Sequence, residues 1–490
     1  MLKTIQIKNL KSIVDSGPIE LKPLTVVIGK NSSGKSSFLR VFPLLKQSYV
    51  VNLSEPILWY GDYVDFGSFR NTLNSECIKG DCIEFIMTFE NVTSIYSLNA
   101  TKITNINVSM SIKERSITKY EININNKNKI VLEEHDGKKY NIIINDEKID
   151  CAPLVLVDYR TNKFPIYVSR DEGGLYFPFY SIPKEIFGKY SNANQLERYI
   201  LREDRILDIN KKISLDSAKT IAHKIFKEVI KAEKEIEEDD LVMIANMLIR
   251  NTVVDVLSSV EDTVANTFRS VQYFQPLRSR GDRFYRVQGL NTKEIDSDGN
   301  NGPMFLYNMQ KEKEKEFEKW CFENFGFAYS ISKFGDGLES TSITIKNKLE
   351  KTEHNLTDTG FGYSQIFPII LSLWNYTENQ RRSNYERIIV IEQPELHLHP
   401  SFQKRIMNAI IKIIEIAKKK RMGIKFIIET HSETIVNYLG KLISNNYDNN
   451  SDINLLVCDM IDKKSRFEKM IFNKDGLIEN WPNGFFSDDE

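Results

Sequence analysis

The sequence has few cysteines, a formal net charge of only −1 and no long apolar run. Its five cysteines are odd in number and scattered through 490 residues, a usage that fits reduced thiols in a cytosol and argues against a disulfide framework. Cys77 and Cys82 lie close together, but no second pair or histidine completes a zinc pattern. Because 66 Lys and Arg residues nearly balance 67 Asp and Glu residues, no global field attracts the whole protein to nucleic acid or anionic lipid.

The sequence also lacks an obvious targeting or membrane segment. Residues 1–13 alternate apolar and polar side chains, as a strand does, without the continuous apolar core of a signal peptide. The apolar run at residues 366–374 is too short to span a bilayer. We therefore expect a cytoplasmic protein that makes no membrane contact.

A chain of this length is expected to form either one large core with insertions or two or three compact units. Residues 1–50 read as strand, turn, strand and a Gly/Ser loop that opens a helix. In residues 51–190, short β-branched runs (83–88, 103–110, 120–124, 140–144) predict an inserted antiparallel sheet. Residues 191–335 predict a helical insertion, with helices at 197–206, 217–234 and 239–264 and a charged, solvated helix at 309–325.

In residues 336–490, strands and helices alternate, which predicts a parallel sheet. The expected strands are 341–345, 387–391 and 424–428, and the expected helices are 364–376, 401–420 and 432–439. The prediction is therefore an α/β fold whose central domain is split between the two chain ends, around the sheet and helical insertions.

The segment Gly29-Lys30-Asn31-Ser32-Ser33-Gly34-Lys35-Ser36 fits the P-loop pattern, with an apolar strand before it and a helix-compatible stretch after it. Glycines let backbone N–H groups turn toward phosphates, and Lys35 reaches the β- and γ-phosphates. Ser36 supplies a hydroxyl to Mg²⁺. The alternative, a plain Gly/Ser turn, is disfavoured by the Gly-Lys-Ser spacing. The predicted nucleotide-binding residues here are Gly29, Lys30, Asn31, Ser32, Ser33, Gly34, Lys35, Ser36 and Ser37.

An acidic side chain follows the apolar strand 387–391. Mg²⁺ needs an oxygen ligand opposite the P-loop, and Glu392, at the end of a buried parallel strand, is the candidate. Glu395 follows closely. For both residues the alternative is a solvated strand end, which the preceding apolar run disfavours.

Three histidines lie near strand ends. His431 follows the strand 425–428, where contact with a γ-phosphate is expected, although a histidine taken alone is more often a hydrogen-bonded structural residue. His397 and His399 have a spacing that a metal site uses. We expect them instead to shape a turn or a subunit contact, because no third ligand cluster accompanies them.

Four motifs in order resemble the ABC-like AAA ATPases related to SMC proteins and to the ATPase of OLD nucleases. They are NLKSI…LTVVIGKNSSGKSS, TDTGFGYSQIFPII, IIVIEQPELHLHP and FIIETHSE, and the closing ENWPNGFF resembles the C-terminal WPxGFF segment of one subgroup. The resemblance is strong over residues 1–40 and 275–486 and weak between them. It implies an ABC-ATPase-like head with ATP and Mg²⁺ as cofactors.

The resemblance also implies residue roles. Two subunits sandwich ATP, so that the signature residues Gly360, Gly362, Ser364 and Gln365 of one face the P-loop of the other; without the resemblance, a helix cap is an equal alternative. Ser36 and Glu392 hold Mg²⁺, residues 394–400 cross the dimer seam, and His431 is the switch residue. Gln393 occupies the usual position of the catalytic glutamate. Since an amide cannot accept a proton at neutral pH, hydrolysis is expected to be slow unless Glu395 or a partner group substitutes.

Two basic stretches bear on partners. Residues 278–286 interleave arginines with aromatics, which suits DNA or RNA contact as well as phosphate contact. Residues 418–421 lie at a predicted helix C-terminus, where the helix dipole favours cations without any ligand.

Fewer than sixty residues follow His431, without the acidic cluster of a nuclease domain. The leading hypothesis is therefore an ATP-gated homodimer, or a higher homo-oligomer, that regulates a separate nuclease-like effector in phage defence or DNA repair. The alternative is a DNA-repair ATPase that clamps nucleic acid itself. A membrane-transport ATPase is disfavoured by the large insertion and the SMC-like signature.

Overall fold

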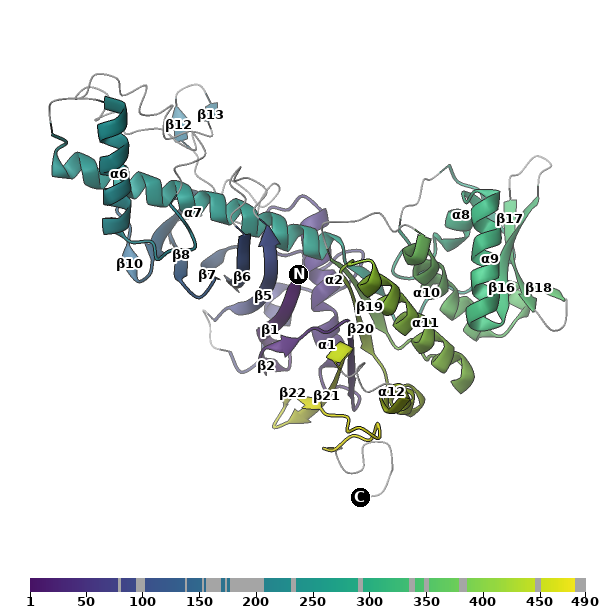
Figure 1. Ribbon diagram of the computed structural model, residues 1–490. Coiled ribbons are helices and arrows are strands. Elements are labelled where there is room, and N and C mark those ends of the chain that lie inside the picture. The colour runs from purple at the N-terminus through teal and green to yellow at the C-terminus, as the bar shows by residue number, and fades with distance from the viewer. Residues whose placement is uncertain are drawn as a thin grey trace. The chain divides into compact units, whose positions relative to one another are not determined.

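The computed structural model describes residues 1–77, 81–93, 102–136, 139–151, 154–155, 169–171, 174–176, 207–230, 235–289, 294–334, 340–347, 352–378, 386–445 and 451–480. The chain forms two compact units (Figure 1). Unit 1 contains Met1–Ile19 and Gln47–Arg269, and unit 2 contains Glu20–Lys46 and Ser270–Glu490. The predicted helix 197–206 and the WPxGFF segment lie outside the described residues.

The two units do not coincide with the four segments predicted from the sequence. The first 19 residues lie in unit 1, and residues 270–335, which the sequence assigned to the helical insertion, lie in unit 2. The central prediction nevertheless agrees with the fold, because the P-loop segment and the C-terminal third of the chain lie in one unit.

Unit 1 contains an antiparallel sheet in the order β10-β9-β8-β7-β6-β5-β1-β2. The predicted strand runs are confirmed: burial alternates along β7, and each strand of this order pairs with its neighbour in the antiparallel sense. Its strands are β1 (Leu2–Leu10), β2 (Ile13–Asp15), β5 (Ile83–Thr93), β6 (Lys102–Ile112), β7 (Ile117–Ile124), β8 (Asn128–Asp136), β9 (Lys139–Ile144) and β10 (Glu147–Lys148), with β3 (Ile19–Glu20) on β1 and β11 (Leu154–Val155) on β9.

The position of β1 differs from the prediction. The sequence placed this strand at the opening of the P-loop domain, but it pairs with β5 of the inserted sheet, with Ile5 opposite Met87 and Ile7 opposite Phe85. The physical reason is its alternating pattern, which buries one face and suits an antiparallel sheet better than a strand buried on both faces.

The remaining elements of unit 1 include the predicted helices. α6 (Leu215–Ile230) and α7 (Glu238–Arg269) confirm the helices expected at 217–234 and 239–264. α7 is long and apolar enough to cross a membrane by length and composition, a property that the sequence analysis overlooked. However, 72% of its apolar window is buried inside the structure, as in a core helix. The other elements are α3 (Phe69–Thr72), β12 (Ser169–Asp171) and β13 (Gly174–Tyr176).

Unit 2 is built on a six-stranded sheet in the order β14-β19-β20-β4-β21-β22. The first five strands run parallel, and β22 pairs antiparallel to β21. The carboxyl ends of the five parallel strands therefore lie at one edge of the sheet, where ligands bind in open α/β sheets. The strands are β14 (Gln272–Phe274), β19 (Arg387–Glu392), β20 (Ile424–Glu429), β4 (Leu24–Gly29), β21 (Ile453–Ile461) and β22 (Lys464–Met470). This arrangement confirms the predicted α/β fold.

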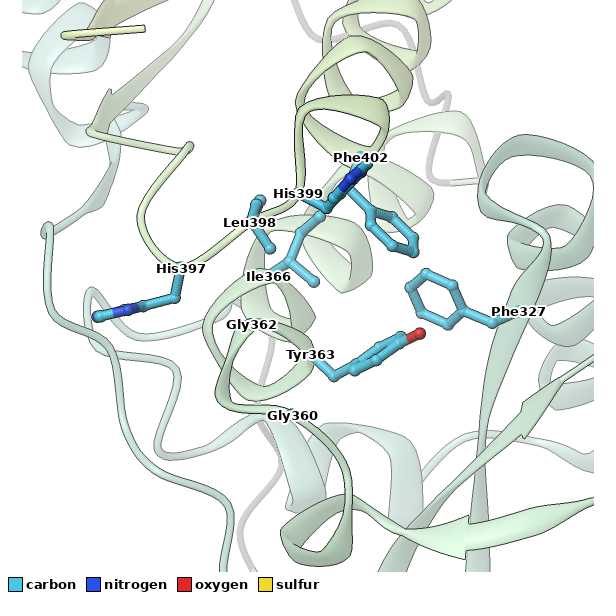
Figure 2. Close-up of a pocket in the computed structure, with 9 residues that line it drawn as sticks. All are labelled: Phe327, Gly360, Gly362, Tyr363, Ile366, His397, Leu398, His399 and Phe402. Atoms are coloured by element: carbon cyan, nitrogen blue, oxygen red, sulfur yellow. The ribbon is translucent and has the colours of Figure 1, made fainter.

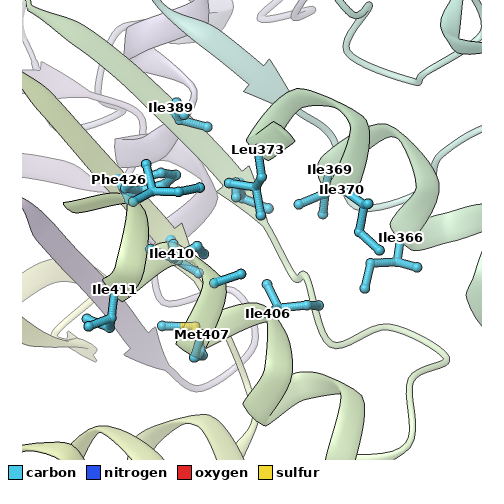
Figure 3. Close-up of a cluster of buried hydrophobic side chains, with 14 of the residues drawn as sticks. Ile366, Ile369, Ile370, Leu373, Ile389, Ile406, Met407, Ile410, Ile411 and Phe426 are labelled. Atoms are coloured by element: carbon cyan, nitrogen blue, oxygen red, sulfur yellow. The ribbon is translucent and has the colours of Figure 1, made fainter. Parts of the chain in front are cut away.

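Helices α10 (Phe361–Glu378), α11 (Pro400–Lys419) and α12 (Glu433–Asn445) share a core with this sheet. Ile369 and Leu373 of α10 and Ile410 of α11 pack with Ile389 and Phe426 of the sheet (Figure 3). β4 and β20 are buried at every position, and their sequences are mostly apolar, which is why the sequence identified them as core strands.

A smaller layer of unit 2 carries the predicted charged helix. α9 (Lys311–Phe325) has the expected ion pairs, such as Lys319–Glu323, but it also buries Phe317 and Cys321. It packs on β16 (Phe327–Phe334), which pairs with β17 (Ser340–Asn347). The other elements of unit 2 are α8 (Gly302–Tyr307), β15 (Tyr285–Arg286), β18 (Glu353–Asn355), the 3₁₀ helix η2 (Leu356–Asp358) and α1 (Lys35–Leu39); α2 (Val41–Val50) crosses the boundary between the units.

Candidate functional site

The P-loop joins β4 to α1, as predicted. Two of its residues need a left-handed backbone, Gly34 with φ of 106° and Ser32 with φ of 63°. A side chain at Gly29 would lie 2.2 Å from the carbonyl oxygen of Cys458 on β21, so glycine is required there. The loop is thus fixed by its neighbouring strand in a conformation that leaves backbone N–H groups for phosphate.

The Lys35 side chain is folded along the loop. Its Nζ donates hydrogen bonds to the carbonyl oxygens of Gly29 (2.9 Å) and Lys30 (2.7 Å), and only 3% of the residue is exposed. Burial lowers the pKa of Lys35, opposed by the negative charge of Glu429. A buried ammonium with only carbonyl partners is well placed to exchange them for a phosphate.

Both oxygens of Glu392 have partners within the chain. Arg40 donates to them through Nε and Nη2, both at 2.8 Å, and the Tyr273 hydroxyl donates to Oε1 at 2.8 Å. These bonds raise the pKa of the Arg40 guanidinium, and burial raises the pKa of Tyr273. The predicted magnesium role of Glu392 thus stays a prediction, and in this structure the side chain ties α1 to β14.

A second carboxylate, Glu429, was missed by the sequence analysis. It ends β20 and accepts a hydrogen bond from the Ser36 hydroxyl at 3.0 Å. Its Oε2 is buried and has no hydrogen-bond partner. Burial, reinforced by the charge of Glu392, raises the pKa of Glu429 to about 7. The available signal was its position at the end of a core strand, the same signal that selected Glu392.

Gln393 and Glu395 follow β19 in a tight loop. Gln393 has a left-handed backbone with φ of 46°, and its N–H donates to the carbonyl oxygen of Glu429 at 2.8 Å. Glu395 accepts a hydrogen bond from the backbone N–H of His431 at 2.7 Å, while its Oε2 is buried without a partner. Burial raises the pKa of Glu395. A free carboxylate oxygen of raised pKa has the properties of a general base.

His431 lies in the same cluster, at the carboxyl end of β20. Its Nε2 is 4.0 Å from Glu429 Oε1. Burial and then the charge of Lys35 lower the pKa of His431, so the ring is neutral at pH 7. The structure therefore brings the predicted Lys35, Ser36, Glu395 and His431 to one sheet edge; contact of His431 with a γ-phosphate stays a prediction.

The signature residues lie at the start of α10. Gly360 is exposed, and a side chain there would meet nothing within 4 Å. Gly362 lies against the next loop, where a side chain would approach the carbonyl oxygen of His397 to 2.5 Å. Ser364 is buried and its hydroxyl donates to the carbonyl oxygen of Phe361 at 2.8 Å. Of these residues, Gly360 is thus the one open to a second molecule.

Gln365 and Arg278 hold each other inside the chain. Gln365 Oε1 accepts from the Arg278 N–H at 2.9 Å, and its Nε2 donates to the Arg278 carbonyl oxygen at 2.8 Å. The guanidinium Nη2 donates to the carbonyl oxygen of Glu392 at 2.8 Å. Direct nucleotide contact by Gln365 stays a prediction, but both of its amide atoms already have partners.

In the Arg-rich stretch, contact with nucleic acid stays a prediction, although three arginines have partners within the chain. Arg278 is only 4% exposed, so it is not available to nucleic acid. Arg280 lies over the ring of Phe361, 5.4 Å from its centroid, and Arg283 pairs with Asp358. Three arginines therefore brace the segment that leads into α10. In the second stretch, Lys418 pairs with Asp452.

A family model for the AAA ATPase domain matches residues 1–436. The chain belongs to this family. The match confirms the resemblance to AAA-type ATPases that the four motifs indicated, whereas the relation to OLD nucleases stays a prediction. No curated protein matches the sequence.

The AAA ATPase is also similar to solved structures of SMC heads. It is 11% identical to an Smc head domain from Pyrococcus furiosus bound to the C-terminal domain of ScpA, with 96% of each chain covered and a TM-score of 0.39. The SMC head domain from Thermotoga maritima gives 10% identity, coverage of 96% and 98%, and a TM-score of 0.36. The recombination mediator protein RecF is 10% identical, with 96% of this chain and 98% of RecF covered and a TM-score of 0.30. At these identities and TM-scores, the similarity does not identify a partner or a substrate of this chain.

His397 and His399 of this AAA ATPase shape a turn, as predicted. His397 has φ of 61°, and His399 caps α11, accepting from the Ser401 N–H through Nδ1 at 3.3 Å. Over the described ranges, no group of three His, Cys, Asp or Glu side chains forms a metal site. Mg²⁺ with ATP does not need one, because phosphates and water complete its coordination.

A small cavity of about 170 Å³ adjoins the signature of the AAA ATPase. The rings of Phe327, Tyr363 and Phe402 gather on one side of it (Figure 2), with centroids 4.8 to 5.8 Å apart. Gly360 and Gly362 also line it. The cavity is apolar and therefore unsuited to phosphate.

Proposed function

We propose that this AAA ATPase binds ATP and Mg²⁺ at the P-loop edge and closes into an ATP-gated homodimer that regulates a separate effector in phage defence or DNA repair. The observation that carries the proposal is the chain of bonds from Gln365 through Arg278 to the Glu392 carbonyl oxygen. It links the start of the signature helix to the loop after β19. A second molecule that binds at the signature would therefore shift the position of the loop that follows β19 in the ATP site.

The exposed Gly360 supports the dimer. It precedes α10, whose first backbone N–H groups attract an anion, and its surroundings within 4 Å are open. Gln393 supports the gating, because slow hydrolysis would keep a nucleotide-bound state long enough to signal. The effector is expected to be a nuclease-like protein, and its interaction is expected in the cytoplasm.

The dimer is tested by light scattering after size-exclusion chromatography. We expect ATP with Mg²⁺ to double the mass of the wild type and Gly360→Trp to remain monomeric. A Cβ at Gly360 meets no atom of its own chain within 4 Å, whereas the bulk of the indole would block a second copy. Gly289→Trp is the matched control, since Gly289 is also exposed with nothing within 4 Å. A Gly360→Trp variant that dimerises as the control does would contradict this geometry.

The effector is tested by co-purification with the product of the neighbouring gene. A complex, or an altered activity of either protein with ATP, would support the proposal. If the two proteins form no complex and neither activity changes, the result would count against the proposal.

A second candidate, direct clamping of DNA or RNA, is favoured by one surface. Phe284 and Phe334 are 56% and 47% exposed and meet edge to face with centroids 5.6 Å apart. Arg283, Arg286 and Lys333 flank them in sequence, and exposed rings beside cations suit single strands.

Fluorescence anisotropy with a single-stranded DNA tests this candidate at low salt with and without ATP. Stacking predicts that Phe284→Ala weakens binding about 5- to 150-fold, from about 1–3 kcal/mol per stacked base. Leu477→Ala, at another exposed apolar residue, is the control. Absence of binding by the wild type at low salt would remove the candidate.

A further inference from the structure

The hairpin of β21 and β22 lies beyond residues 1–436, which the family model matches, and it flanks the P-loop. β21 pairs in parallel with β4, so that Cys458 lies opposite Gly29, the first residue of the loop. Phe467 of β22 packs against Phe38 of α1, with ring centroids 5.3 Å apart. The hairpin therefore supports both the loop and the helix that follows it.

Cys458 contacts the P-loop at two points. Its carbonyl oxygen occupies the space that a side chain at Gly29 would need, 2.2 Å from the position of an added Cβ. Its thiol donates a hydrogen bond to the Ser33 carbonyl oxygen, with Sγ and the oxygen 3.1 Å apart. Cys458 and Ser33 are both buried, so bulk water does not compete for this bond.

The Cys458 thiol keeps its proton at neutral pH. Burial raises the pKa of Cys458 to about 12, against the opposing effects of the hydrogen bond with Ser33 and of the charge of Lys35. A buried cysteine of raised pKa is chemically inert, whereas its S–H group remains a hydrogen-bond donor. The structure thus offers a donor at this position rather than a nucleophile.

The bond to Ser33 orients the next peptide group of the loop. The C=O and N–H groups of a trans peptide lie in one plane and point in opposite directions. The peptide between Ser33 and Gly34 is trans, and its oxygen is held by Cys458 of β21. The Gly34 N–H therefore points away from β21. In a P-loop, such backbone N–H groups face the phosphates.

Ser33 has weaker restraints within the loop itself. Its N–H donates to the carbonyl oxygen of Lys30 at 3.3 Å, a long hydrogen bond. Its hydroxyl oxygen is buried and has no hydrogen-bond partner. The bond from Cys458 is therefore the contact that ties the carbonyl group of Ser33 to the central sheet.

We propose that Cys458 is a positioning residue for ATP binding, whose thiol holds the Ser33 carbonyl oxygen and thereby turns the Gly34 N–H toward the phosphates. This inference rests on the proposed ATP site. It gives the strand β21, which lies outside the matched residues, a role in nucleotide binding.

The test compares variants of the full chain that keep or lose the donor. Titration measures the affinity for a fluorescent ATP analogue, and competition measures the affinity for inorganic tripolyphosphate, which has no base or sugar. Cys458→Ala is expected to weaken both affinities about 3- to 10-fold, the effect of losing one hydrogen bond. Cys458→Ser keeps a donor at this position, and both affinities are expected to stay within about twofold of the wild type.

Cys321→Ala is the matched control, because Cys321 is also a fully buried thiol of unit 2 but lies on α9, in contact with β16. It is expected to lower the melting temperature and to leave both affinities unchanged. A purely structural role of Cys458 would give the same result as this control. Cys458→Val, a second variant without a donor, replaces Cys458→Ala if melting curves show that the alanine variant does not fold.

The role of Cys458 would be overturned if the wild type binds both ligands and the donor-free variants bind them equally well. It would also be overturned if Cys458→Ser weakens binding as much as Cys458→Ala, since the donor would then not be the cause. If the wild type binds neither the analogue nor tripolyphosphate, the proposed ATP site itself is wrong, and this inference is wrong with it.

Discussion

Lys35→Ala is expected to weaken ATP binding about 10- to 150-fold, the equivalent of about 1.5–3 kcal/mol for a hydrogen bond to a charged group. The Lys35 ammonium is buried, with the carbonyl oxygens of Gly29 and Lys30 as hydrogen-bond partners. Phosphate oxygens are stronger partners than carbonyls because they carry charge. Titration with a fluorescent ATP analogue measures the change directly.

Lys404→Ala is the matched control for this prediction, because Lys404 is an exposed lysine on α11. Equal affinities of wild type and Lys35→Ala would show that the P-loop does not bind nucleotide in the predicted way. The same variant also controls for contaminating ATPases in turnover assays. Tight Mg-ATP binding by the wild type without turnover would indicate a nucleotide-held switch that a partner releases.

Glu395→Gln is expected to lower kcat for ATP hydrolysis by about 10²- to 10⁴-fold, the usual contribution of a general base. Gln393 cannot accept a proton, whereas Glu395 has a buried oxygen without a partner and a pKa raised by burial. ATP affinity should change little, because the variant keeps the shape of the side chain and its bond from the His431 N–H. Steady-state phosphate release measures kcat.

Gln393→Glu provides the reciprocal experiment. It returns a carboxylate to the position where related ATPases carry one, and we expect it to raise turnover and to rescue Glu395→Gln. Glu415→Gln, an exposed position on α11, is the control. Unchanged turnover in Glu395→Gln would exclude Glu395 as the base and direct attention to a group from a second subunit.

Local patterns in the sequence were sufficient for much of the fold. The P-loop was recognised because glycines, a lysine and a serine at fixed spacing must lie between a strand and a helix, and this is how Gly29–Ser36 folds. The strands before Glu392 and His431 were recognised because parallel strands buried on both faces read as largely apolar runs. Both signals depend only on neighbours in the chain.

The sequence pattern was less informative about strands that pair over long distances. β1 alternates in the way that an antiparallel strand does, but nothing local indicated that it would pair with β5, some eighty residues later. Conversely, β14 is only three residues long, too short to be recognised as a strand from the sequence. It belongs to the sheet because it pairs with β19.

The sequence by itself determined that this chain is a P-loop ATPase with an α/β head split between its ends, because those features follow from residue spacing and burial periodicity. Only the tertiary structure decided which side chains meet at the sheet edge. Arg40, Tyr273 and Glu392 are far apart in the chain, as are Ser36 and Glu429, and each meeting depends on the order of β14, β19, β20 and β4. Strand order is set by packing across the whole core, so no spacing along the chain encodes it.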